Sequence, residues 1–317
     1  MAAVILDYET RSKADLTEVG AFRYAIDPST EILMAGVALT DPDAPVHLWV
    51  NPKYETPDML SDPQALELLR QAELVYAHNV PFELALTWGK GLPGVRIQMH
   101  QWRCTMAMAR VAGLPPGLGQ LAEALGLAQK KDIKGRKLIK LFSEPQEDGT
   151  FVDPKSLPDD WAAFGAYCRQ DVITERAVHR RLAAFELKGD SLATFQFDLR
   201  MNLRGIPVNT HALRNAQKII DDVEGRVTEE FRRLTGLNPT QRQKILELLQ
   251  SLGVKIDNMQ ADTLEGLAPA DSRAARILEL YRKLSYAAVK KVTKMLDWVC
   301  PDNRLRGVFT YYGAGTG

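Results

Sequence analysis

One short segment constrains the fold of this chain most, because residues 2–6 form an apolar run that ends abruptly at Asp7. A run of this length is typical of a buried β-strand, and an acid at its carboxyl end predicts a strand that opens into a site. Residues 32–39 and 46–50 form two further runs of this kind. The Thr-Asp-Pro-Asp sequence at 40–43 has turn chemistry, so it predicts an antiparallel hairpin between them.

Helical and strand-like segments alternate after this hairpin. Residues 62–69 predict a helix, residues 73–77 a fourth strand, and residues 81–88 the helix that this strand feeds. The alternation predicts an α/β fold in which a mixed β-sheet is flanked by helices. Further along the chain the pattern is helical, with predicted helices at 105–112, 118–127, 161–187 and 273–299 and a polar loop at 144–160.

The length of 317 residues exceeds that of a usual single domain, so we expect two domains. The first spans residues 1–190, and the second, mainly α-helical, spans 191–317. The composition, with 45% apolar and 25% charged residues, is that of a soluble globular protein. The 40 basic and 40 acidic residues balance, which does not exclude nucleic acid as a partner, because local patches decide such contacts.

The cysteines and the apolar segments indicate a cytoplasmic protein. Cys104, Cys168 and Cys300 lie far apart, so they predict neither a disulfide framework nor a CxxC metal site. Thiols of this kind fit a reducing compartment. The apolar run before Asp7 is too short for a signal peptide or a membrane helix, and no later segment is long enough, so we expect no membrane partner.

Three separate segments offer acidic side chains. Asp7 and Glu9 lie two residues apart on the first strand, so their carboxylates project from one face of it. Tyr167 and Asp171 lie four residues apart in a predicted helix, which places the phenol and the carboxylate on one helical face. Between them in sequence, Glu83 falls in the first turn of the helix that follows the fourth strand.

A cluster of carboxylates suits hard divalent cations, because Mg²⁺ and Mn²⁺ prefer oxygen ligands. Two such ions about 4 Å apart can neutralise a phosphodiester, activate the attacking water and stabilise the leaving oxygen. We therefore expect Asp7 to bridge two Mg²⁺ or Mn²⁺ ions, Glu9 and Asp171 to complete the tighter site, and Tyr167 to hold the nucleophilic water. The structural alternative is a surface acid pair and a half-buried tyrosine beside a solvated acid.

The order of these segments resembles that of the proofreading exonucleases of the DEDD family, which have an RNase H-like fold. The three motifs of that family are Asp-x-Glu, Asn-x-x-(Phe/Tyr)-Asp and Tyr-x-x-x-Asp, and they are matched by Asp7 with Glu9, Asn79 with Phe82, and Tyr167 with Asp171. The tyrosine of the third motif indicates the DEDDy subgroup. The second motif departs from the pattern, because Glu83 stands where the family has Asp. Its longer side chain suits ligation of the looser metal through water, and a helix N-terminal acid is its structural alternative.

The resemblance is more specific at several places. Leu-Asp-Tyr-Glu-Thr-Arg-Ser at 6–12 and Tyr-Cys-Arg-Gln-Asp-Val at 167–172 look like bacteriophage family A DNA polymerases, and 201–209 resembles the segment that opens their polymerase region. Residues 276–298 resemble a thumb helix, whose cations would contact a primer-template duplex: Arg282, Lys283, Lys290, Lys291 and Lys294. The likeness implies that the palm and fingers motifs lie beyond Gly317, so we expect no polymerase activity from this chain.

Substrate contacts are expected on both sides of the acidic residues. The resemblance implies that Thr10 and Asn79 flank the terminal nucleotide, while Phe82 either wedges against a base or fills the core. The basic run at 130–140 could neutralise the phosphates of an incoming single strand, and from it we select Lys131, Lys134, Arg136 and Lys137. A solvated charged face is the alternative for these lysines.

The leading hypothesis from the sequence is a metal-dependent 3′-to-5′ exonuclease that acts on single-stranded DNA 3′ ends, the editing part of a phage-type polymerase. A non-catalytic DNA-binding module is the alternative from a different class, supported by Glu83 and by the neutral net charge. An RNA 3′-end exonuclease is the third, because the carboxylate cage does not itself recognise the sugar, which is told apart through the 2′-hydroxyl.

Overall fold

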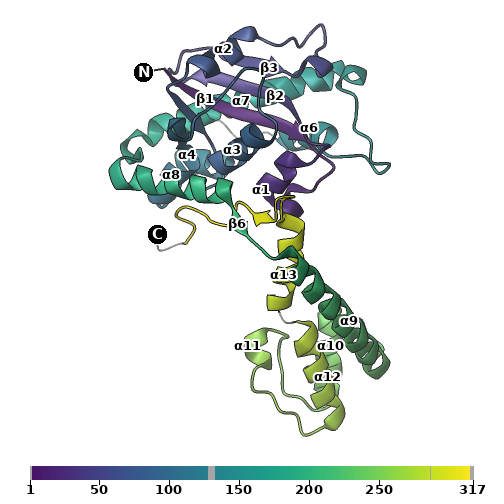
Figure 1. Ribbon diagram of the computed structural model, residues 1–317. Helices are drawn as coiled ribbons and strands as arrows, with labels where there is room; N and C mark the ends of the chain where they lie inside the picture. The colour runs from purple at the N-terminus through teal and green to yellow at the C-terminus, as the bar shows by residue number, and fades with distance from the viewer. Residues whose placement is uncertain (1, 128–132, 286, 315–317) are drawn as a thin grey trace. The chain divides into compact units, whose positions relative to one another are not determined.

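The computed structural model describes residues 2–127, 133–285 and 287–314, and its central feature is a mixed five-stranded sheet (Figure 1). The strands lie in the order β3-β2-β1-β4-β5. β2 runs antiparallel to both of its neighbours, whereas β4 and β5 run parallel to β1. Their bounds are β1 Ala3–Arg11, β2 Glu31–Leu39, β3 Val46–Val50, β4 Leu74–Ala77 and β5 Trp102–Cys104. The expected α/β fold with a mixed sheet is therefore confirmed, as is the hairpin of β2 and β3.

Strand β1 is longer than the sequence predicts. Its pairing with β2 continues to Arg11, past a register shift between Glu9 and Thr10, so Asp7 and Glu9 lie inside the strand and not at its exit. The backbone ladder explains the difference, because main-chain hydrogen bonds to β2 form whatever the side chains are. The parallel pairing with β4 covers only Ala3 to Ile5, so the acids lie beyond the last paired residue on that side.

Helices cover both faces of the sheet. On one face α7 packs against β1, β2 and β3, and α6 packs against α7. On the other face the hydroxyl of Tyr8 in β1 contacts Thr87 of α3, and α3 packs against α1. The helices of this part are α1 Leu16–Ile26, α2 Pro63–Gln71, α3 Val80–Gly89, α4 Thr105–Val111, α5 Leu118–Ala124, α6 Ile133–Ser143, α7 Pro158–Arg181 and α8 Gly189–Arg204.

A second compact unit spans Asn209–Asp297 and is helical. Its core is built around Phe231, Ile245, Leu249 and Ile277, all buried. The helices are α9 Thr210–Thr235, α10 Arg242–Ser251, α11 Ala261–Leu264, α12 Ser272–Leu284 and α13 Ala287–Trp298. The single helix predicted at 273–299 is wrong, because the structure has two helices, α12 and α13, over these residues.

The chain returns to the first unit after α13. Residues from Trp298 onward group with those up to Val208, which differs from the expected division after residue 190. The return is held by a short antiparallel pair, β6 Ile206–Pro207 with β7 Arg304–Leu305, and by the Trp298 indole, which donates to the Glu18 carbonyl at 2.8 Å. Contacts that join such distant segments leave no local sequence pattern, so periodicity could not have found them.

Two further expectations concern the cysteines and membranes. Cys104, Cys168 and Cys300 are free thiols, all buried. In the described residues, none of the helices has the length and apolar character that crossing a membrane requires.

Candidate functional site

Asp7 and Glu9 project from the face of β1 that α7 covers. One ligand-type atom from each of Asp7, Glu9 and Cys168 lies within 4.8 Å of the others, and the Cys168 Sγ is 4.0 Å from Asp7 Oδ2. Glu9 is buried, whereas Asp7 keeps part of its surface in contact with solvent. The two acids therefore share one face, as the sequence predicts, and that face remains accessible at Asp7.

Close packing of α7 on the sheet depends on a glycine. Gly36 of β2 is the register partner of Asp7. A Cβ at Gly36 would lie 2.7 Å from Cγ2 of Val172 and 3.2 Å from Sγ of Cys168, distances that are shorter than ordinary contacts. Only a residue without a side chain lets the helix approach this closely, so Gly36 brings the third acidic segment to the first.

Tyr167 and Asp171 face the same cluster from α7. The Tyr167 hydroxyl is hydrogen-bonded to the Asp171 side chain. Burial and, after it, the charge of Asp171 raise the pKa of Asp7 well above its ordinary value. Burial, then the charges of Asp7 and Asp171, raise the pKa of Glu9 in the same way. Three carboxylates from two distant segments thus repel one another in a site of low polarity.

The Tyr167 ring is held between two helices. It stacks on Phe164 of α7 with ring centroids 6.2 Å apart and an interplanar angle of 14°. From α6, Gly135 lies against it so closely that a Cβ there would be 2.3 Å from the ring atom Cε2. The phenol is therefore fixed in direction by its neighbours, with its hydroxyl on Asp171.

Glu83 joins the cluster from the first turn of α3. Its side chain is buried, and its Oε2 has no hydrogen-bond partner among the described residues. Burial raises the pKa of Glu83 well above its ordinary value, and the charges of Asp7 and Glu175 add to the effect. The charge of Asp7 therefore acts on Glu83, whereas the ligand-type atoms grouped within 4.8 Å of one another in the described residues are those of Asp7, Glu9 and Cys168.

One acid of the cluster was missed by the sequence analysis. Glu175 of α7 is 1% exposed and accepts a hydrogen bond of 3.1 Å from the Thr105 hydroxyl. Burial is the largest cause that raises its pKa, followed by the charge of Asp7. A signal was available, because Glu175 follows Asp171 by one helical turn and so lies on the same face.

The predicted substrate residues differ in their surroundings. The Thr10 hydroxyl is buried and 2.9 Å from the Tyr24 hydroxyl, and the Phe82 ring packs against Tyr24 with centroids 6.2 Å apart. Asn79 is the residue before α3 and adopts a left-handed backbone conformation, with φ of 82°. Phe82 is only partly buried. It therefore packs against the core without being enclosed in it.

The basic run forms part of α6. Arg136 and Lys137 are exposed on this helix, beside Gly135, which touches Tyr167. Lys134 lies in the same helix. Lys131 lies outside the described residues. The helix that carries these cations therefore borders the acidic cluster.

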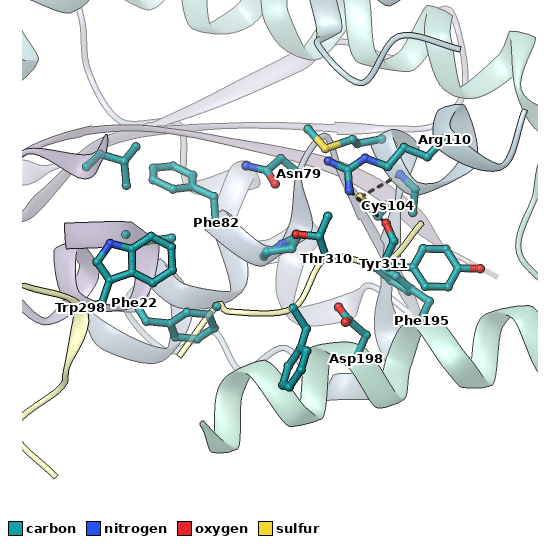
Figure 2. Close-up of a pocket in the computed structure, with 18 residues that line it drawn as sticks. Phe22, Asn79, Phe82, Cys104, Arg110, Phe195, Asp198, Trp298, Thr310 and Tyr311 are labelled. Carbon is teal, nitrogen blue, oxygen red and sulfur yellow. Dashed lines mark hydrogen bonds between the residues drawn. The ribbon is translucent and has the colours of Figure 1, made fainter. Parts of the chain in front are cut away.

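A separate cavity of about 350 Å³ lies beside α3 within the first unit (Figure 2). Asn79 and Phe82 line it, and the next residue of α3 is Glu83, whose pKa burial and the charge of Asp7 raise. Its wall is rich in aromatic side chains and is completed by the returning C-terminal segment, with Phe22, Phe195, Trp298, Thr310 and Tyr311 among the lining residues. Two of the three uncharged residues predicted to hold substrate thus border one apolar hollow.

Among known proteins, the sequence is similar to that of a phage DNA polymerase. The DNA polymerase of Bacillus phage SP02 is 31% identical over 323 aligned residues, which cover 99% of this chain and 49% of that protein. The chain is thus similar in sequence to a phage DNA polymerase. It spans about half the length of this curated relative. The resemblance to phage-type polymerases that the motifs indicated is confirmed at this level. No protein-family model matches the chain.

A solved structure gives a weaker likeness. The POL domain of Pol1 from M. smegmatis, in complex with DNA primer-template and dNTP, superposes with a TM-score of 0.50. The superposition covers 96% of this chain and 47% of that one, with 15% sequence identity. At this identity the likeness concerns the fold alone.

Proposed function

We propose that this chain is a metal-dependent 3′-to-5′ exonuclease that hydrolyses phosphodiester bonds at single-stranded DNA 3′ ends. One observation carries the proposal: the ligand-type atoms of Asp7 and Glu9 lie within 4.8 Å of each other and of the Cys168 Sγ on α7, the helix that also carries Tyr167 and Asp171. Burying carboxylates that have no opposite charge beside them lowers the stability of a fold. Their presence here therefore favours a function over a structural role. The relation to a phage DNA polymerase supports DNA as the substrate class.

The donor set fits divalent cations. The ligand atoms offered by Asp7 and Glu9 are carboxylate oxygens, which Mg²⁺ and Mn²⁺ prefer. The buried Glu83 Oε2, which lacks a hydrogen-bond partner in the described chain, is the kind of orphan that a cation or its bound water would satisfy. We assign the tighter metal site to Asp7, Glu9 and Asp171, with Asp7 bridging, and the looser one to Asp7 and Glu83.

Each residue then has a task in hydrolysis. The bound ions would supply neutralisation of the scissile phosphodiester and activation of water. Asp7, Glu9 and Asp171 hold their carboxylates ready on facing elements, so little reorganisation is needed. Tyr167, fixed between Phe164 and Gly135, directs its hydroxyl at Asp171 and would orient the attacking water there.

The surroundings of the cluster suit an unpaired strand. Arg136 and Lys137 on α6 would attract its phosphates, an interaction that weakens as salt rises. On the α3 side, Asn79 and Phe82 line the aromatic cavity, where an unpaired base could stack. The cations lie on α6 beside Tyr167 and the cavity lies on the α3 side, an arrangement that would suit a strand whose 3′ end lies at Asp7.

The helical unit is proposed to contact duplex DNA. Lys290 and Lys291 of α13 are exposed and available to phosphates. Two other cations expected there are engaged within the chain, since Arg282 donates to the Leu267 carbonyl at 3.0 Å and Lys283 pairs with Glu279 at 2.7 Å. We therefore assign duplex contact to Lys290 and Lys291 ahead of Arg282 and Lys283.

A nuclease assay tests the proposal. Single-stranded DNA labelled at its 5′ end is incubated with the protein and Mg²⁺ or Mn²⁺, with a chelator in a parallel reaction and a matched RNA strand in another. We expect stepwise shortening from the 3′ end that stops on chelation and is faster on DNA. Uncut DNA that still binds would instead identify a non-catalytic module, and faster cleavage of RNA would overturn the substrate assignment.

A further inference from the structure

Glu175 connects three segments around the acidic cluster. Thr105, the first residue of α4, places its hydroxyl 3.1 Å from Glu175 Oε1. The same hydroxyl lies 2.9 Å from Nδ1 of His78, the residue that follows β4. The Nε2 of His78 lies 2.8 Å from the Pro116 carbonyl oxygen. The backbone N–H of His78 also bonds to Glu175, so that α7 is tied to β4 through both the side chain and the main chain.

The number of protons available for these hydrogen bonds fixes the net charge of His78 and Glu175 taken together. A carbonyl only accepts, so Nε2 of His78 carries a proton that it donates to Pro116. The Thr105 hydroxyl has one proton to give. If Thr105 donates it to Glu175, then His78 Nδ1 must donate to Thr105, and His78 is cationic beside an anionic Glu175. If Thr105 donates to His78, Glu175 must be the protonated partner. In both arrangements the sum of the two charges is zero.

A neutral sum explains how Glu175 can be buried beside Asp7 and Glu83. An added anion would make the cluster harder to form, whereas a balanced triad adds hydrogen bonds without net charge. The next residue, Asn79, has a left-handed backbone with φ of 82°, a conformation that a non-glycine residue keeps only when its surroundings impose it. The bond from His78 N–H to Glu175 is one such constraint.

We propose that His78, Thr105 and Glu175 form a net-neutral triad that positions the second acidic motif, locking the turn at Asn79 to α7 so that Glu83 faces Asp7. This inference rests on the proposed exonuclease. Glu175 acts through Glu83 and is a positioning residue, because the Thr105 hydroxyl and the His78 N–H occupy its carboxylate. Its part resembles that of the outer-shell partners which orient metal ligands in other proteins.

Four variants of the full chain test the triad. Thr105→Val removes the hydroxyl at nearly constant shape, and Thr105→Ser restores it. Glu175→Leu removes both side-chain oxygens at similar size, so it breaks the triad in either proton arrangement. Thr87→Val is the matched control, because that hydroxyl bonds to Tyr8 at 3.2 Å on the opposite face of the sheet. Mn²⁺ affinity is measured by titration calorimetry, and kcat and KM are measured on a single-stranded DNA oligonucleotide.

We expect Thr105→Val to lower Mn²⁺ affinity and kcat by roughly 10- to 100-fold with KM unchanged, the usual cost of losing an outer-shell partner. Thr105→Ser and Thr87→Val should behave as wild type. If Thr105→Val does not fold, a loss of Mn²⁺ affinity in Glu175→Leu carries the same test, because leucine can replace Glu175 in neither proton arrangement. Wild-type Mn²⁺ affinity in both triad variants, or a serine variant as defective as the valine one, would overturn the triad. A wild-type protein that binds Mn²⁺ but cuts no DNA would overturn the proposed function and leave the affinity test standing.

Discussion

The acids of the two units have opposite environments. In the sheet unit, Asp7, Glu9 and Glu83 lie among other carboxylates, and burial with mutual repulsion raises the pKa of each. In the helical unit, Glu230 receives two hydrogen bonds of 2.8 Å from Arg276, and the bonds from Arg276 lower its pKa. The charged form of a carboxyl group is thus disfavoured in the sheet unit and favoured in the helical unit.

This difference distinguishes the candidate site around Asp7 from the structural ion pair of Glu230 and Arg276. The Glu230 pair is half-buried and satisfied within the chain, so it needs nothing further. The acids around Asp7 oppose folding unless positive charge arrives from outside, which is the usual signature of a functional cluster. Changes to the two groups should therefore have unlike effects, on activity for the first and on little but local structure for the second.

The largest effect is expected from the acids themselves. Asp7→Ala or Asp171→Ala removes a proposed metal ligand, so turnover of single-stranded DNA should fall by more than the roughly 100-fold upper range for an outer-shell partner. Glu230→Ala, an acid of the helical unit, is the control and should cut at the wild-type rate. Single-turnover rates decide the matter, and undiminished cleavage by Asp7→Ala would show that the site lies elsewhere.

A pair of glycine substitutions compares the units through one chemical change. In Gly135→Ala the new methyl group would meet the Tyr167 ring, whereas nothing lies within 4 Å of a Cβ at Gly225 in α9. The added methyl group would displace the phenol and with it the part of α7 that carries Asp171, so kcat should fall by up to roughly 100-fold, the cost of a misplacement of about 1 Å. Gly225→Ala should leave kcat unchanged and stabilise its helix by up to about 1 kcal/mol. Equal kcat values for both variants would contradict the role given to Tyr167.

Features that depend on residues close together in the sequence, or on recognisable motifs, could be predicted, whereas features that depend on other contacts between distant segments could not. The hairpin of β2 and β3 follows from apolar runs and a turn, and the convergence of Asp7 with Asp171 follows from the order of the motifs. The extension of β1 past Glu9 does not, because it depends on pairing with β2. Neither does the contact of Gly135 with Tyr167, since it joins two helices whose packing leaves no periodic pattern.

Glu175 shows a different limit. Its spacing from Asp171 was readable in the sequence, but its bonds to Thr105 and His78 join segments that are far apart in the chain. A sequence motif identifies an acid as a candidate site residue. An acid outside every motif is identified only when its hydrogen-bond partners in the fold are known. The same holds for the return of the chain at Trp298, whose indole reaches the Glu18 carbonyl.

A smaller change is expected from the hydroxyl of Tyr167. Tyr167→Phe keeps the ring between Phe164 and Gly135 and removes only the hydrogen bond to Asp171. Loss of one such bond corresponds to about tenfold in kcat, with KM for the oligonucleotide unchanged. Steady-state kinetics on the same DNA strand measure both constants. A loss as large as that of Asp171→Ala would show that the phenol does more than orient water.

The pH dependence of stability, the smallest effect, should have opposite signs in the two units. Because the pKa values of Asp7, Glu9 and Glu83 are raised, the metal-free sheet unit should gain stability as pH falls through those values and lose it as pH rises. The pKa of Glu230 is lowered, so its contribution is present above the ordinary glutamate pKa of about 4.3 and is lost below it.

All 5 tryptophans lie in the first unit, so their fluorescence during urea unfolding reports on it. As the pH is lowered from neutral without metal, the urea midpoint should rise for the wild type and for Arg276→Ala, and rise less for Asp7→Asn, which starts from a higher value. A midpoint in Asp7→Asn that follows the wild type would mean that these acids do not strain the fold, and the contrast between the units would fail.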